Sequence, residues 1–195
     1  MEVGVVVYPG VQHAAVLGLT DLFEMANRQA ISRRDDGGPM LRVTHWKQGA
    51  QGDLTSVFDS CPEAGASQPS ALILPPSLND PARADAFPTL LSWLRESHAQ
   101  GVMLTSVCAG AFLLAATGLM AGRRMTTHWS YAELLQERYP DIRVDADRLL
   151  IDDGDIISAG DRGAGRITGL YGCGVGAGRA YVSAAFPEGH RNEND

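Results

Sequence analysis

The sequence predicts an α/β fold with a mostly parallel central sheet. Short apolar runs at residues 2–8, 71–74 and 101–107 are typical of strands that are buried on both faces. Segments with apolar residues at helical spacing separate these runs. Because strands and helices alternate along the chain, we expect parallel strands joined by helical crossovers.

Proline and glycine residues mark the ends of the expected elements in the first half of the chain. Pro9-Gly10 closes the first apolar run, and Pro75-Pro76 stops another. The expected elements are a strand at 2–8, a helix at 16–29, a polar loop at 31–40, a strand at 41–46, an irregular stretch at 50–70 and a strand at 71–74.

In the second half, Pro88 is expected to open a helix over PTLLSWLRESHAQ. A strand at 101–107 and a helix from Ala109 to about Thr117 follow. Ser130 and Glu133 form a capping-box pattern that predicts a helix at 130–138. Asp153-Gly154, between two apolar runs, predicts a β-hairpin.

The length of 195 residues fits one domain, which we place at residues 1–160. From residue 161 to 195, glycine recurs every few positions and no helical or strand period persists. This tail is either loosely ordered or differs from the C-terminal part that such a domain should have, through truncation or an altered reading frame. We expect poor order there. No helix-turn-helix module is recognisable.

Composition excludes several classes of function. The net charge of −7 argues against direct nucleic-acid binding, which favours a basic face. No apolar stretch approaches the roughly 20 residues that cross a bilayer, and no signal peptide is recognisable. Three scattered cysteines predict no disulfide framework, so we expect a cytoplasmic protein. Cysteines and histidines are not paired at ligand spacing, so we predict no metal and no cofactor.

The segment TSVCAGAFLLAATGLMAGRRMTTHW, residues 105–129, is the most informative in the chain. An apolar strand ends at Cys108, small residues follow, and a helix begins. A thiol at such a turn faces unpaired N–H groups and the positive end of the helix dipole, and both favour thiolate. His128, in the polar turn TTHW, is a candidate partner for the sulfur.

Three segments resemble the ThiJ/PfpI superfamily, which has a class I glutamine amidotransferase-like fold: VVVYPGVQHAAVLGLTDLFEMANR, ALILPPS and SVCAGAFLLAATGLMAGRRMTTHW. Within it, the chain is most similar to the amidase-like N-terminal domains of AraC-type transcriptional regulators. The resemblance covers roughly residues 1–160. It implies a flavodoxin-like three-layer sandwich, a homodimer, and Cys108 at a strained nucleophile elbow.

The chain departs from the superfamily at two positions near the expected site. Enzymatic and redox-active relatives carry an acid on the first helix, and the alignment puts Ala15 there. Without that acid, the thiolate lacks a hydrogen-bond donor and the site lacks an acid/base group. Pro76-Ser77 replaces a usual Gly-Gly pair, which leaves the Ser77 N–H to hold an oxyanion.

These features favour a ligand-sensing regulatory domain without turnover, which binds a small molecule over Cys108. The expected ligand-binding residues are Cys108, Ala109, Ser77, Ala15, His13 and His128, with Cys108 and His128 as a remnant catalytic pair. The alternative is a cysteine-dependent hydratase or amidase similar to isonitrile hydratase. A third hypothesis is a redox-sensing stress protein, in which peroxide oxidises Cys108 and spares Cys61.

The other chemistry-bearing residues have ordinary interpretations. Gln12 and His13 are more typical of a solvated loop than of a ligand site. Trp129 and Tyr131 are assigned to packing by default. The remaining candidates are a solvated hairpin turn at Asp152, Asp153 and Asp155, an incidental thiol at Cys61, and Cys173 in GCGVGAG, where neither a strand nor a helix supports a dinucleotide loop.

Overall fold

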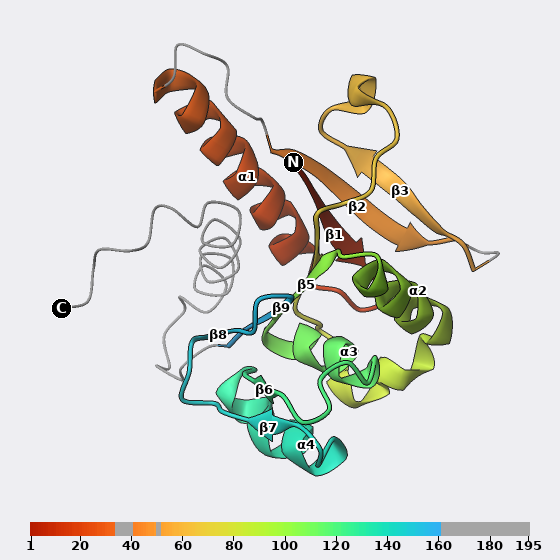
Figure 1. Cartoon of the computed structure of the whole chain (residues 1–195), viewed down its shortest axis with the longest axis vertical. Coiled ribbons are helices and arrows are strands. Elements are labelled where there is room, and N and C mark those ends of the chain that lie inside the picture. The colour runs from red at the N-terminus through yellow and green to blue at the C-terminus, as the bar shows by residue number, and fades with distance from the viewer. Residues whose placement is uncertain (34–40, 50–51, 161–195) are drawn as a thin grey trace.

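The computed structural model describes residues 1–33, 41–49 and 52–160 (Figure 1). Its centre is a seven-stranded sheet in the order β3-β2-β1-β4-β5-β9-β8. The strands are β1 (Glu2–Val7), β2 (Arg42–Gln48), β3 (Leu54–Asp59), β4 (Ala71–Leu74), β5 (Met103–Val107), β8 (Leu150–Asp152) and β9 (Ile156–Ala159). All neighbours pair in parallel except β2 with β3 and β8 with β9. The predicted fold class is confirmed.

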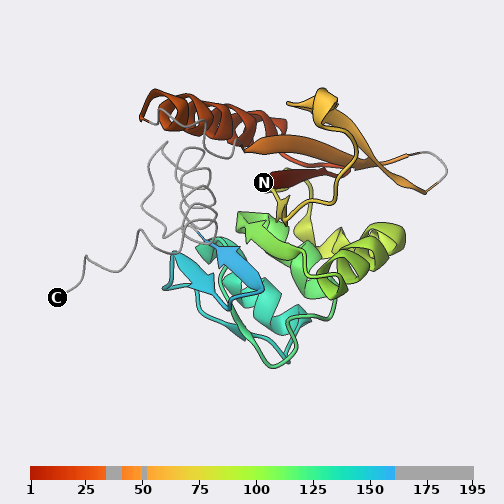
Figure 2. The ribbon, with the colours of Figure 1, turned by 45° about the horizontal axis from the view of Figure 1, so that its top comes forward.

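Helices cover both faces of this sheet. The helices are α1 (His13–Arg33), α2 (Pro88–Ala99), α3 (Ala111–Ala116) and α4 (Ala132–Arg138). The chain moves from β1 to β2 in one direction across the sheet and from β4 to β5 in the other. Because such crossovers are right-handed, α1 and α2 lie on opposite faces (Figure 2).

The reversal of direction creates a topological switch point between β1 and β4. In open α/β sheets, ligands bind beyond the carboxyl ends of the strands at such a point. Here those ends are followed by Tyr8 and Pro75. All four residues of β4 are buried, and so are the residues of β1 up to Val6, so the strands that frame the switch point form the centre of the core.

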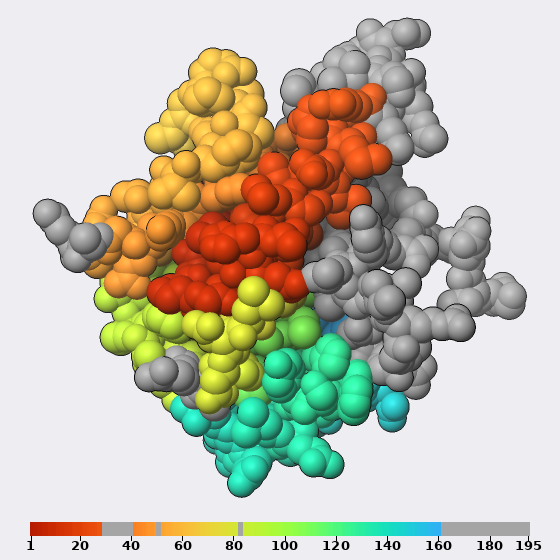
Figure 3. All heavy atoms as spheres, turned by 180° about the vertical axis from the view of Figure 1, so that it is seen from behind, coloured from red at the N-terminus to blue at the C-terminus, as the bar shows by residue number. Residues whose placement is uncertain are grey.

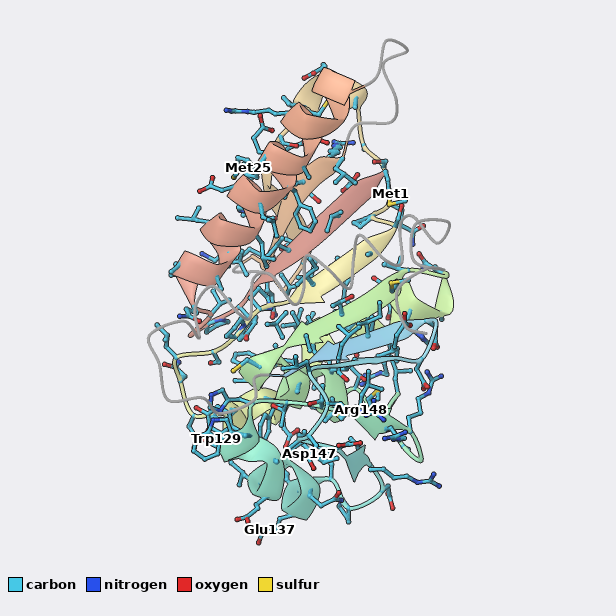
Figure 4. All side chains as sticks on the ribbon, turned by 90° about the vertical axis from the view of Figure 1, so that its left-hand side faces the viewer. Met1, Met25, Trp129, Glu137, Asp147 and Arg148 are labelled. Atoms are coloured by element: carbon cyan, nitrogen blue, oxygen red, sulfur yellow. The ribbon has the colours of Figure 1, made fainter. Side chains whose placement is uncertain are left out.

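A small second sheet lies beyond the carboxyl end of β5. It pairs β6 (Arg124–Met125) with β7 (Arg143–Val144), and α4 packs beside it. At the opposite end of the fold, α1 exposes Met25, which Figure 4 shows on the outer side of the helix. Within the described residues, no helix combines the length and the apolar character needed to cross a bilayer.

Several expectations about elements were wrong. The irregular stretch at 50–70 contains β3, which pairs antiparallel with β2 and extends the sheet. The first helix runs on to Arg33, into the expected loop. Ser130 does not cap a helix, because α4 begins at Ala132 and its N-terminus receives no side-chain hydrogen bond. The tail at 161–195 lies outside the described residues.

The predicted hairpin at Asp153-Gly154 is confirmed, with β8 and β9 antiparallel. Asp155 is not simply solvated: it forms two hydrogen bonds with Arg123, at 2.6 and 3.0 Å, and its Oδ2 lies 2.9 Å from His98 Nε2. These contacts tie the hairpin to the C-terminal turn of α2. Chiefly because of the Arg123 guanidinium, the pKa of Asp155 is lowered to about 2.

We predict that, in Asp155→Asn, the free energy of unfolding falls less steeply as the pH is lowered than it does in the parent chain. The folded-state pKa of Asp155 lies below its unfolded value of about 3.9, so its contribution is complete above pH about 4 and is lost as the pH falls toward 2. Because the side chain is 43% exposed, the loss is at most about 1 kcal/mol. Urea denaturation between pH 2.5 and 6 measures it. If the free energy of unfolding fell as steeply at low pH in the variant as in the parent chain, Asp155 would not be the group responsible.

Gly110, in the 3-10 turn after β5 (Cys108–Gly110), packs against the end of β4. A Cβ at this position would lie 2.2 Å from the Leu74 carbonyl oxygen and 2.8 Å from that of Pro75. Both obstacles are backbone atoms and cannot swing away. The strand-to-helix turn therefore requires glycine here.

We predict that Gly110→Ala lowers the free energy of unfolding by about 2 kcal/mol or more, because an added methyl group overpacks the turn. The matched control is Gly18→Ala in α1, where nothing lies within 4 Å of the added Cβ. There the better helix propensity of alanine should stabilise the protein by up to about 1 kcal/mol. Equal effects of the two substitutions in urea denaturation would refute the close contact.

Candidate functional site

Cys108 sits at the turn between β5 and α3, as predicted. Its φ angle of 54° lies in the left-handed region, and it is the single non-glycine residue with positive φ in the described ranges. Such a backbone costs on the order of 1–3 kcal/mol and persists only where the surroundings enforce it. The strain and the half-buried position of the thiol are those of a nucleophile elbow.

Groups from three other segments hold this elbow. Gly110 fits beneath the carbonyl oxygens that end β4. The hydroxyl of Thr127 donates to the Cys108 carbonyl oxygen at 2.8 Å. On the β1 side, the buried Tyr8 donates its hydroxyl to the carbonyl oxygen of Pro75. Burial raises the pKa of Tyr8 far above its usual value, and the charge of Cys108 adds to this, so Tyr8 remains a neutral donor.

The segment that carries His128 is anchored beside the elbow. The Thr126 N–H donates to Ser158 Oγ at 2.9 Å, which ties the segment to β9. At Gly160, a Cβ would lie 2.4 Å from the Thr127 carbonyl oxygen, so the chain after β9 passes directly against this segment. Together with the Thr127–Cys108 hydrogen bond, these contacts place the backbone before His128 at the sulfur-bearing turn.

The His128 ring itself is engaged by the next turn. Its Nδ1 accepts from the Ser130 N–H at 3.2 Å and lies 2.7 Å from Ser130 Oγ. An N–H donates only to an unprotonated ring nitrogen, so the proton of the neutral ring is assigned to Nε2. Nε2 is then a donor and cannot take a proton from a thiol. In the described part of the chain, the ring's other contacts are Trp129 and Tyr131, with centroids 5.6 and 5.8 Å away.

A cavity of about 280 Å³ opens at the switch point, next to the elbow. It is framed by residues that follow β1, β4 and β5 and by the 3-10 segment Pro81–Ala86. Its described lining residues are Tyr8, Pro9, Ser77, Asn79, Asp80, Pro81, Ala84, Ala86, Phe87, Ala109, Phe112 and Leu113. A hollow of this size suits a small metabolite.

Of the six predicted ligand-binding residues, Ser77 and Ala109 line this cavity. Cys108 directly precedes Ala109 in the chain but is not itself among the described lining residues, so its binding role stays a prediction. His13 is exposed at the start of α1, and Ala15 lies in the first turn of that helix. These two residues and His128 are not among the described lining residues, and their binding roles stay predictions.

The backbone and the hydroxyl of Ser77 differ in how they are used within the chain. It forms an isolated antiparallel bridge with Val11, and the two hydrogen bonds around that bridge use the N–H groups of Gln12 and Leu78. The Ser77 N–H therefore takes no part in the bridge. Its hydroxyl donates to the Gly10 carbonyl oxygen and accepts from the Asn79 N–H. The Ser77 hydroxyl is thus engaged within the chain, whereas the backbone N–H is not used by the bridge.

Sequence reasoning missed most of the cavity. It found no acid to replace the missing one at Ala15, whereas the structure places Asp80 on the lining, from the loop after β4. It also passed over Tyr8 and Phe112. The signal that finds Tyr8 and the 77–80 loop is the switch-point rule, because both directly follow strands that frame the reversal.

Comparison with known proteins finds relatives of this chain among both regulators and enzymes. The regulator CdhR of Pseudomonas aeruginosa is 33% identical over 125 residues, which are 64% of this chain and 34% of the regulator. Isonitrile hydratase of Pseudomonas putida is 31% identical over 137 residues, 69% of this chain and 55% of the enzyme. The chain thus spans about a third of the one relative and about half of the other.

Solved structures show the same fold. Drosophila melanogaster DJ-1beta superposes with a TM-score of 0.63 at 15% identity, over 94% of this chain and 90% of its own. An AraC family transcriptional regulator from Pseudomonas putida gives 0.60 at 19% identity, over 96% and 94%. The DJ-1/PfpI family matches residues 3–166, which include the Cys108 elbow and all the framing strands, and this chain belongs to that family.

Proposed function

We propose that this chain is a sensory domain of a regulatory system, which binds a small molecule in the switch-point cavity and does not turn it over. The observation that carries the proposal is the cavity itself, enclosed by the ends of β1, β4 and β5 beside a strained Cys108. The similarity to regulators such as CdhR supports the regulatory role. The homodimer expected from the resemblance stays a prediction.

The proton donors and acceptors at positions 8, 15 and 128 support ligand binding rather than turnover. Alanine at position 15 brings no titratable group, Tyr8 is a donor to Pro75, and the Nδ1 of His128 is occupied by the Ser130 N–H. A cysteine nucleophile needs a neighbouring base or a depressed pKa, and general acid/base catalysis needs a positioned proton acceptor. None of these three positions supplies a base or a positioned proton acceptor for the thiol.

The second candidate is a cysteine-dependent hydratase or amidase. The elbow favours it, because a strained Cys108 next to the Ala109 backbone is the arrangement in which a nucleophile attacks and an N–H holds the developing charge. The similarity to isonitrile hydratase points the same way. In this version, Asp80 supplies the acid that Ala15 lacks.

We predict that a metabolite library screened by thermal shift yields ligands that lose their effect in Ala86→Trp. Ala86 is exposed yet lines the cavity, so the indole should fill the hollow without disturbing the core and should weaken binding at least about tenfold. Ala99→Trp, at the exposed end of α2, is the matched control. Isothermal titration gives the dissociation constants.

Turnover assays on isonitriles and amides complete the test. We expect no product above background with the unmodified chain. Product formation that disappears in Cys108→Ser would replace the sensory proposal with the enzymatic one. Ligands that bind Ala86→Trp as well as the parent chain would place the binding site elsewhere.

A further inference from the structure

Helix α4 supplies none of the described lining residues of the switch-point cavity, yet both of its ends contact the cavity walls. Tyr131 is the N-cap residue of this helix and Tyr139 is its C-cap residue. In Figure 3, the blue-green atoms that include α4 form the lower end of the molecule. The side-chain contacts at the two ends reach different walls, so the helix bridges them from outside.

The N-terminal attachment is an aromatic contact with α3. The Tyr131 ring meets the Phe112 ring edge-on, with centroids 6.0 Å apart and an angle of 88° between the planes. Phe112 is buried and lines the cavity. Tyr131 also packs beside the His128 ring, which contacts the exposed Trp129. Figure 4 shows Trp129 at the outer surface. A series of neighbouring rings thus connects this wall of the cavity with the surface in front of α4.

The C-terminal attachment reaches the 3-10 segment that frames the cavity, Pro81–Ala86. The Arg138 guanidinium forms an ion pair with the Asp85 carboxylate. The hydroxyl of Tyr139 donates to the other carboxylate oxygen at 3.1 Å. The residues on either side of Asp85 both line the cavity. The framing segment is therefore held from behind by the end of α4.

Between its ends, α4 is anchored by one buried side chain. Leu135 is fully buried and is the single buried residue of this helix, whereas Glu133 and Glu137 are exposed. The ion pair at the C-terminal end is itself exposed, and such pairs contribute little to stability, so it can rearrange at low cost. Because the helix is held at its middle and attached to a different wall at each end, a change in the separation of the walls tilts it.

We propose, on the basis of the sensory function above, that α4 transmits the occupancy of the cavity to the surface. A ligand that fits best when the two walls lie further apart shifts the population toward that arrangement. The displaced walls tilt the helix about Leu135, and the exposed Glu133 and Glu137 move with it. Packed rings and hydrogen bonds are the contacts that carry such coupling. The outer face of α4 is then the surface on which a regulatory partner detects the bound ligand.

Fluorine NMR of the full chain labelled with 5-fluorotryptophan tests transmission along the helix. Trp129 reports on the N-terminal end, and Trp129→Phe assigns its resonance. Trp46 and Trp93, whose ring centroids lie 5.5 Å apart between β2 and α2, are internal references. Arg138→Ala removes the C-terminal ion pair, about 10 Å along the helix from Tyr131. The Trp129 resonance should shift, and the two reference resonances should stay in place.

The matched control is Glu137→Ala. It also truncates a charged side chain in the last turn of α4, but the Glu137 side chain is exposed and forms no ion pair with the described residues. All three resonances should keep their positions in this variant. A Trp129 shift as large as that in Arg138→Ala would mean that any change in the last turn moves the resonance, which would contradict the assigned attachment.

Amide hydrogen exchange, followed by mass spectrometry, tests transmission in the opposite direction. Peptides that cover residues 81–87 report local opening of the framing segment. Tyr131→Leu changes the N-terminal attachment only, so exchange at 81–87 should rise only if α4 couples its two ends. We expect a rise of about twofold or more, which corresponds to weak coupling in such networks. Peptides from β2 and β3 should exchange as in the parent chain, which separates this effect from global destabilisation.

An unmoved Trp129 resonance in Arg138→Ala, or unchanged exchange at 81–87 in Tyr131→Leu, would overturn this inference, because the two attachments would then be independent contacts. The sensory proposal would survive either result if library ligands still depended on an open cavity at Ala86. Loss of that dependence would remove the proposed function itself, whatever the coupling along α4.

Discussion

The site depends on the close approach of the turn after β5 to the end of β4. Gly110 lies beneath the carbonyl oxygens of Leu74 and Pro75, at a separation that admits no side chain. Because this contact is between backbone atoms, it fixes the two strand ends relative to each other. Tyr8 then binds the same Pro75 carbonyl from the β1 side. Because Ala109 belongs to this turn and lines the cavity, the junction also fixes the position of that part of the cavity wall.

The sequence predicted the centre of the fold and missed its edge. β1, β4 and β5 are buried on both faces, so their sequences are continuous apolar runs that predict strands. Within the described residues, β3 pairs with β2 alone and leaves Val57 and Phe58 exposed, so burial imposes no alternating pattern on its sequence. Ser130 matched a capping box, but its N–H and hydroxyl bind the His128 ring, a contact that local spacing does not encode.

The site was predictable only where one segment builds it. Cys108 and Ala109 lie in a single strand–turn–helix motif, which is legible in the sequence. Asn79 and Phe112 reach the cavity from different elements, and only the order of strands in the sheet brings them together. The strand order depends on the direction of each crossover, and hydrophobic periodicity gives no information about that direction. From the sequence, Ser77 was expected at the site, whereas Asn79 and Asp80 were not.

The position of Asp80 decides how the missing acid at Ala15 should be understood. An acid on the first helix would serve the sulfur, whereas Asp80 lines the cavity and belongs to the same loop as Asn79. Under the proposed sensory function, the strained turn at Cys108 adjoins the cavity through Ala109, which lines it. Under that proposal, the chain lacks at Ala15 the acid that would assist proton transfer, while it keeps the cavity that would bind a ligand. The same elbow can thus serve a binding domain without any change in the strands that build it.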